Sequence, residues 1–181
     1  MLMLRALIYL TALMVAGCAD THKLTRMNGA TTPLSQEASA YIALPADGRY
    51  GAILYLGSGP QTAQLIAAAF APYLSRISVA TASEDVATAI RSAKGGGYDY
   101  VVYPEILHWE DRATEWSGKP DLASIKISIV QTDSGDVIDI GIIEGASGLA
   151  TFGGDHPQDL LPEPLRKYSG ALIDDRRRAD R

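Results

Sequence analysis

The feature that most constrains this chain is its N-terminus, where Arg5 precedes ten almost wholly apolar residues, Ala6–Val15, and the small residues Ala16 and Gly17. A positive charge, a short apolar segment and small residues before a cut are typical of a secretory signal peptide. Ten apolar residues are half of the ~20 that a membrane-spanning helix needs, so a transmembrane anchor is the weaker interpretation. Removing residues 1–17 would leave 164 of the 181 residues, enough for one domain with a core.

Cys18 follows this segment and is the only cysteine in the chain, which excludes an internal disulfide and a zinc site built from several cysteines. The run Val15-Ala16-Gly17-Cys18 resembles the lipobox of bacterial lipoproteins. The resemblance implies cleavage between Gly17 and Cys18 and lipidation of Cys18, whose several acyl chains would hold the protein firmly on a membrane. Residue 19 is Ala and not the Asp that retains many such lipoproteins in the inner membrane. The implied address is therefore the outer membrane, with the domain in the periplasm.

The expected mature chain has three parts. Residues 18–38 are rich in Thr, Ser and Asn, lack apolar periodicity, and are expected to form the lipidated N-terminus and a flexible tether. Residues 39–174 form the domain, and residues 175–181 a charged tail. The formal net charge of −5, or −6 without Arg5, provides no electrostatic footprint for nucleic acid.

Apolar periodicity predicts alternating strands and helices, followed by a hairpin and a last helix. The clearest signal is the hairpin, where isoleucines alternate on both sides of the turn Asp133–Asp136. Pro104 lies inside another expected strand and indicates an edge or a bulge. This order predicts a single α/β (α+β) domain, a mixed sheet of five to six strands with two or three helices packed on it. Strands are expected at residues 40–44, 51–56 (buried), 76–80, 98–107, 122–132 and 137–145, and helices from Pro60, from Ser83 and over 165–174.

Several short segments of the chain carry a family resemblance: the lipobox, Tyr50-Gly51, Gly57-Ser58-Gly59, Tyr98–Val102 and Asp133–Val137. They resemble a family of bacterial lipoproteins known only as a domain of unknown function, over about residues 40–173. More distantly, the element order is similar to the TolB amino-terminal domain, the curli-secretion lipoprotein and the lipoprotein activators of peptidoglycan synthases. Those proteins bind other proteins or assemble into rings and are not enzymes. The resemblance therefore implies a non-enzymatic protein-binding or assembly module, whose partner is an envelope protein or another copy.

Gly57-Ser58-Gly59 stands between an expected strand and helix, where backbone N–H groups could bind a phosphate. The run lacks both the spacing of a phosphate-binding loop and the third glycine of a dinucleotide fingerprint. A tight turn with a helix cap is the favoured interpretation.

An acidic cluster at the end of one expected strand, Glu105, His108, Glu110 and Asp111, could supply metal ligands or an acid/base pair. On a regular strand Glu105 and His108 point to opposite faces, whereas His108 and Glu110 share one. Two ligands do not make a metal site, and His156 is not placed by the sequence. We therefore favour a solvated strand end, with no metal, no cofactor and no catalytic residue. The alternative is an envelope hydrolase or a small-ligand or metal-binding protein built near His108.

Both tryptophans, Trp109 and Trp116, flank the polar connection that follows this strand. Large aromatic side chains on loops are frequent at binding hot spots. The sequence thus proposes Glu105, Trp109, Arg112 and Trp116 as partner-binding residues, and a free edge beside Pro104 that could accept a partner's strand. The alternative for the tryptophans is that one or both cover the core.

Overall fold

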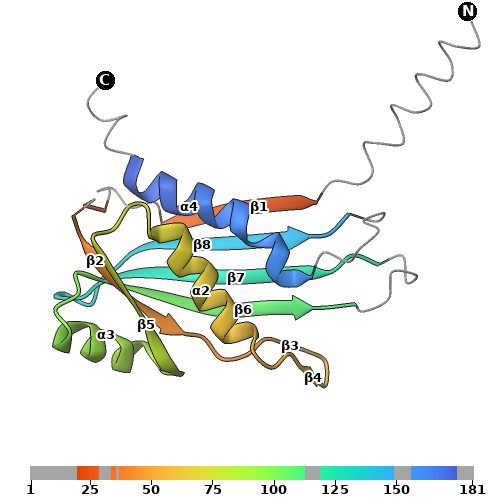
Figure 1. Cartoon of the computed structure of the whole chain (residues 1–181), viewed down its shortest axis with the longest axis horizontal. Coiled ribbons are helices and arrows are strands. Elements are labelled where there is room, and N and C mark those ends of the chain that lie inside the picture. Colours follow the sequence, from red (N-terminus) through yellow and green to blue (C-terminus); the bar gives the residue numbers. More distant parts are fainter. Residues whose placement is uncertain (1–19, 29–33, 36, 113–118, 149–155, 175–181) are drawn as a thin grey trace, which may run out of the picture.

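The computed structural model describes residues 20–28, 34–35, 37–112, 119–148 and 156–174. Within them, six strands form one mixed sheet and two short strands form a separate hairpin (Figure 1). The expected signal peptide, Cys18, Trp116 and the charged tail lie outside the described residues. The strands are β1 Thr21–Asn28, β2 Ser39–Leu44, β3 Arg49–Tyr50, β4 Ile53–Leu54, β5 Arg76–Ser83, β6 Tyr100–Glu110, β7 Leu122–Gln131 and β8 Val137–Ala146; the helices are α2 Ser58–Phe70, α3 Val86–Gly95, the 3-10 helix Pro157–Leu160 and α4 Pro162–Asp174.

The sheet has the strand order β1-β8-β7-β6-β2-β5. β6, β7 and β8 form an antiparallel meander, and β1 pairs antiparallel with β8. β2 pairs in parallel with both β5 and β6. The predicted single domain with a mixed sheet and packed helices is confirmed, as is the β7–β8 hairpin.

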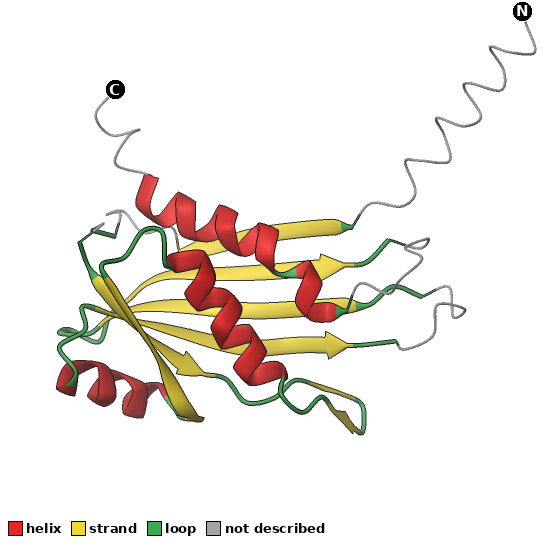
Figure 2. Cartoon of the chain, in the orientation of Figure 1, coloured by secondary structure: helices red, strands yellow, loops and turns green. Residues whose placement is uncertain are grey.

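The main core lies between the sheet and helices α2 and α4, which cross the same face (Figure 2). All four residues predicted to face inward on the last helix are buried, namely Leu165, Tyr168, Leu172 and Ile173. β7 contributes Ile125, Ile127 and Ile129 to the same core. α3 packs on the opposite face against Ala43, Val101 and Val130. Each of them is next in sequence to a residue of the main core, because successive side chains of a strand point to opposite faces. Among the described residues, no helix is long and apolar enough to cross a membrane.

The expected tether is wrong for residues 21–28, because they form the edge strand β1. Every second side chain of β1 is partly buried, and these are His22, Leu24 and Arg26. Two of the three are polar, so the strand has no apolar alternation for sequence analysis to detect. Arg26 is accommodated because its guanidinium lies 2.5 Å from the buried carboxylate of Asp139 on the neighbouring strand.

The expected buried strand over residues 51–56 is also wrong. The run is split by a tight turn, and β3 and β4 pair with each other outside the main sheet. Gly51 is the first of the two residues of this turn, and its φ of 57° is left-handed. Glycine adopts this conformation at no steric cost. The apolar side chains of this hairpin are exposed. A continuous apolar run could not predict this, because burial depends on which distant element covers it.

Candidate functional site

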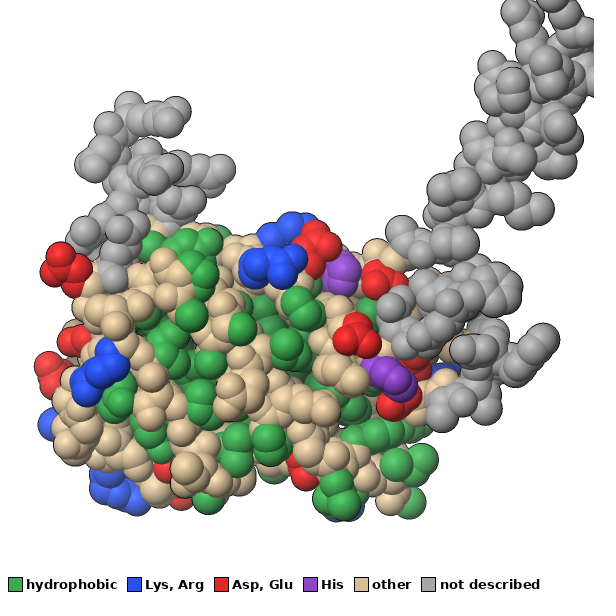
Figure 3. All heavy atoms as spheres, in the orientation of Figure 1, with side chains coloured by type: hydrophobic (Ala, Val, Ile, Leu, Met, Phe, Trp, Pro, Cys, Tyr) green, Lys and Arg blue, Asp and Glu red, His purple; other side chains and the backbone are tan. Residues whose placement is uncertain are grey.

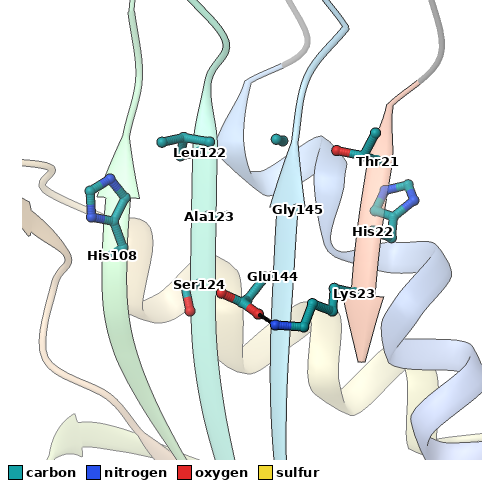
Figure 4. A pocket seen from close by; sticks show the side chains of 10 residues that line it. Thr21, His22, Lys23, His108, Leu122, Ala123, Ser124, Glu144 and Gly145 are labelled. Atoms are coloured by element: carbon teal, nitrogen blue, oxygen red, sulfur yellow. Dashed lines mark ion pairs between the residues drawn. The ribbon is translucent and has the colours of Figure 1, made fainter. Parts of the chain in front are cut away.

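One face of the sheet is open over β6, β7, β8 and β1, because no described helix covers it. The two helices of the main core lie behind these strands (Figure 4). On the open side, α3 packs against β2 and the part of the sheet around Val101 and Val130. Small and polar side chains dominate this open face on β7, including Ser124, Lys126 and Ser128. On β8 it carries Ile140 and Ile142, because the core-facing positions are Asp139, Gly141, Ile143 and Gly145.

A shallow groove with a volume of about 510 Å³ crosses the open face near the start of β1. Lys23 on β1 and Glu144 on β8 line the groove and form an ion pair of 3.0 Å (Figure 4). His108 on β6 and Ser124 on β7 line the part of the groove farther from β1. The other lining residues are Thr21, His22, Leu122, Ala123, Gly145 and Ala146. Sequence analysis missed Lys23, Ser124 and Glu144, because only the pairing of β1 with β8 and of β8 with β7 brings them together.

A bulge in β6 changes the geometry of the acidic cluster. Glu105 pairs with Lys126 and His108 pairs with Ser124, so one extra residue, Leu107, stands opposite no partner. The two register partners lie two residues apart on β7 and face the same side, so Glu105 and His108 share the open face. The expectation that they point to opposite faces is wrong because a bulge shifts the two-residue alternation by one. The irregularity expected at Pro104 is wrong in position, because Pro104 pairs in regular register with Ile127 and the bulge lies three residues farther on.

The cluster's carboxylates are paired with neighbouring basic side chains. Glu110 is buried and binds the guanidinium of Arg112, with His108 Nε2 at 3.2 Å from its other oxygen. Glu105 Oε2 lies 2.5 Å from Lys126 Nζ on the neighbouring strand. Within the described ranges, no group of three or more His, Cys, Asp or Glu side chains is placed to hold a metal ion.

Side-chain contacts also hold the connection that follows β6, where the acidic cluster ends. His156 Nδ1 lies 3.2 Å from Asp111 Oδ2, so the histidine that the sequence could not place joins the end of the cluster. Asp121 accepts a hydrogen bond of 2.5 Å from the backbone N–H of Arg112. Burial raises the pKa of the Asp121 carboxyl. These contacts fix both ends of the connection between β6 and β7.

The four proposed partner-binding residues have different surroundings, and one of them lies outside the described residues. Glu105 and Arg112 belong to the ion pairs just described. Trp109 is 2% exposed and packs in the main core, so its assignment to a contact surface is wrong and the covering role is correct. Trp116 lies outside the described residues. The expected free edge beside Pro104 is limited: β2 pairs with β6 only over Tyr100–Val102, and β3 packs against β6 farther on.

The backbone of Gly57-Ser58-Gly59 binds a side chain of the same protein, that of Asp47. The Asp47 carboxylate accepts hydrogen bonds from the N–H groups of Gly57 at 3.1 Å and Gly59 at 2.8 Å. Ser58 Oγ accepts from the N–H of Gly48 and donates to the carbonyl of Tyr55. Asp47 thus takes the place that a phosphate would occupy, and the predicted turn with a helix cap is confirmed. The same contacts close the base of the loop that carries β3 and β4.

Replacing Asp47 by alanine is expected to lower the free energy of unfolding by about 1–2 kcal/mol, as for the loss of a helix N-cap. Urea denaturation measures the change. Asp136→Ala, an exposed aspartate in the β7–β8 turn, is the matched control and should stay within about 0.5 kcal/mol. Inorganic phosphate should leave the Tm of the unmodified chain unchanged. Stabilisation by phosphate, or equal effects of the two variants, would contradict the assigned role of Asp47.

The comparisons agree with this architecture. A family model described as "Domain of unknown function (DUF4823)" matches residues 32–172. A search of the curated proteins gives no match.

Solved structures of similar fold include the PelC dodecamer from Paraburkholderia phytofirmans, with 11% identity, a TM-score of 0.67, and coverage of 84% of this chain and 99% of that one. A DUF330 protein from Xanthomonas campestris has 12% identity, a TM-score of 0.50, and coverage of 81% and 91%. Lipoprotein GNA1162 from Neisseria meningitidis has 11% identity, a TM-score of 0.44, and coverage of 80% and 99%. At these identities, the likeness to PelC and to the DUF330 protein shows a shared fold.

Proposed function

Since the chain belongs to the DUF4823 family, a domain of unknown function, we propose its role from its geometry: it is a lipid-anchored envelope lipoprotein that acts as a non-enzymatic protein-binding or assembly module. Cys18 carries the anchor, and the outer membrane is the proposed location, with the domain in the periplasm. The open face of the sheet is the proposed contact surface. It replaces the tryptophan loop as the main candidate.

The observation that carries this proposal is a sheet face that, beyond the part packed on α3, no helix of the described residues covers over β6, β7, β8 and β1. A sheet stabilises a domain by burying its faces, and here α2 and α4 bury only one of them over β6, β7, β8 and β1. The groove across the other face is shallow and is lined by residues of all four strands, among them Lys23, His108 and Glu144. Such a surface offers a partner both charged and hydrogen-bonding side chains.

The charges around the groove suit a protein contact. Lys23–Glu144 and Lys126–Glu105 are half-exposed ion pairs that flank the half-buried Ile140 and Ile142. An apolar centre with a polar rim is the usual anatomy of a protein interface. Exposed pairs of this kind contribute little to stability, so their charges are available to a partner's side chains.

The alternative is a hydrolase or a metal-binding protein with its site near His108. The geometry of the described residues supports it less well. Glu110 is buried and already bound to the Arg112 guanidinium and in contact with His108. No hydrogen bond joins His108 to Ser124 in the described part of the chain, although the two face each other across β6 and β7. The similar fold of a protein described as a dodecamer also supports assembly, including assembly with other copies.

The test is in-cell crosslinking of the tagged full-length chain, followed by mass spectrometry. Ser124→Arg places a long, charged side chain in the groove without touching the core, because Ser124 faces away from the helices. It should abolish capture of the partner. Gln64→Arg, an exposed position on α2, makes the same chemical change on the helical side and should leave capture intact. A form without the lipid anchor shows whether capture requires the membrane.

Equal capture by both variants would remove the open face as the contact surface. A set of crosslinked proteins that is the same for unmodified chain, both variants and unrelated envelope lipoproteins would contradict the binding role itself. Capture of the chain's own copies, lost in Ser124→Arg, would identify the function as self-assembly.

A further inference from the structure

The exposed apolar side chains of this domain gather at one place. Of the eight large hydrophobic residues that are exposed in the described chain, four belong to the segment of the β3–β4 hairpin, and a fifth, Leu107, lies in the bulge of β6 beside it. Leu56 is 82% exposed and Ile53 is 56% exposed. Figure 3 shows the hydrophobic side chains at this corner of the molecule. We call this surface the hairpin patch: Tyr50, Ile53, Leu54, Leu56 and Leu107.

The hairpin patch is held in a fixed position. Asp47 and Ser58 close its base through the backbone of Gly48, Gly57 and Gly59. Gly48 packs so closely on Trp109 that a side chain at this position would overlap it. The ring of Tyr50 stands edge-on to His108, with 5.1 Å between the ring centres. These contacts present the apolar side chains on a rigid arm, and not on a loose loop.

The hairpin patch lies at the end of the sheet where β1 starts (Figure 1). The register places Thr21 beside Ala146, Ala146 beside Leu122, and Leu122 beside Glu110. β3 packs against that same end of β6. Thr21 is also only three residues after Cys18, a reach of about 10 Å when fully extended. A lipid on Cys18 would therefore hold this end of the sheet against the bilayer.

We propose that the hairpin patch inserts into the surface of the membrane to which Cys18 is anchored, a step that rests on the proposed lipid anchor. The bilayer is an apolar phase within reach of this end of the domain at all times. Arg49 and Tyr50 flank the aliphatic side chains of the hairpin, and aromatic and basic residues are favoured at the level of lipid headgroups. Two contacts, the lipid and the hairpin patch, fix the orientation of the domain and the direction in which the open face points.

The test uses the full-length lipidated chain in vesicles of phosphatidylethanolamine and phosphatidylglycerol. The Cys18 thiol is consumed by the lipid, so Leu54→Cys creates a single free thiol for a nitroxide spin label. Val137→Cys is the matched control, because Val137 is 47% exposed against 43% for Leu54 and starts β8 at the opposite end of the sheet. Collisions of each label with oxygen, which dissolves in lipid, and with a water-soluble nickel complex report its surroundings. Both positions are exposed, so both variants should keep the Tm of the unmodified chain.

The label at position 54 should collide several-fold more with oxygen than with the nickel complex, and the label at 137 should show the reverse. A chain that floats with the vesicles but has equally water-exposed labels overturns the membrane contact and leaves the anchor standing. A label at 54 shielded from both reagents also overturns it, in favour of a protein contact. A chain that does not float overturns the anchor and the membrane contact together.

Discussion

Replacing Trp109 by alanine is expected to lower the free energy of unfolding by about 3–5 kcal/mol, the range for truncating a large aromatic side chain in a core. Trp109 is 2% exposed and packs in the main core beneath Gly48. The substitution removes this packing and also the support for the base of the hairpin patch. Chemical denaturation of the full chain gives the change. Loss of partner capture in this variant would then follow from unfolding.

Leu107→Ala is the matched control, two residues away on the same strand and 51% exposed. It should change the free energy of unfolding by less than about 0.5 kcal/mol. If Trp109→Ala instead keeps full stability and loses only a partner, then Trp109 is a contact residue and its burial in the core is wrong.

Replacing Asp139 by alanine is expected to cost about 3 kcal/mol, the lower end of the range for breaking a buried ion pair by removing one partner. Asp139 is fully buried, accepts a hydrogen bond of 2.8 Å from the hydroxyl of Tyr168, and pairs with Arg26. The cost lies at the lower end because the Arg26 side chain is 24% exposed and can recover part of its hydration. Urea denaturation measures this difference.

Two further variants separate the contacts of Asp139. Tyr168→Phe removes one hydrogen bond and should cost about 1 kcal/mol. Burial raises the pKa of the Tyr168 phenol, so its hydroxyl remains a donor and this cost should not depend on pH near neutrality. Arg26→Ala combined with Asp139→Ala should cost less than the sum of the two single changes, because they share one interaction. Costs that add fully, or a negligible effect of Asp139→Ala, would mean that β1 is not bound to the sheet in solution.

Much of the fold could be predicted from the sequence, because its signals are local. Helical spacing placed Leu165, Tyr168 and Leu172 on the buried side of α4, where the structure has them. The turn at Asp133–Asp136 joins two strands that pair directly, so the β7–β8 hairpin needed no distant information. The absence of a phosphate-loop spacing around Gly57 likewise indicated a structural turn.

The candidate site could not be predicted in the same way, because it depends on pairing between distant strands. Arg26 and Asp139 are 113 residues apart in sequence, and only their contact explains why a polar segment forms β1. The register that joins β1 to β8 and β8 to β7 brings Lys23, Glu144 and Ser124 into one groove. No local pattern carries this register.

The sequence by itself determined the helices, the last hairpin and the class of fold. The tertiary structure alone decided which apolar residues are exposed. Trp109 is buried because Gly48 lies over it, and the run around Ile53 is exposed because β3 and β4 pair with each other outside the sheet. The physical reason is that hydrophobicity is a property of each residue, whereas burial depends on elements that approach from elsewhere in the chain.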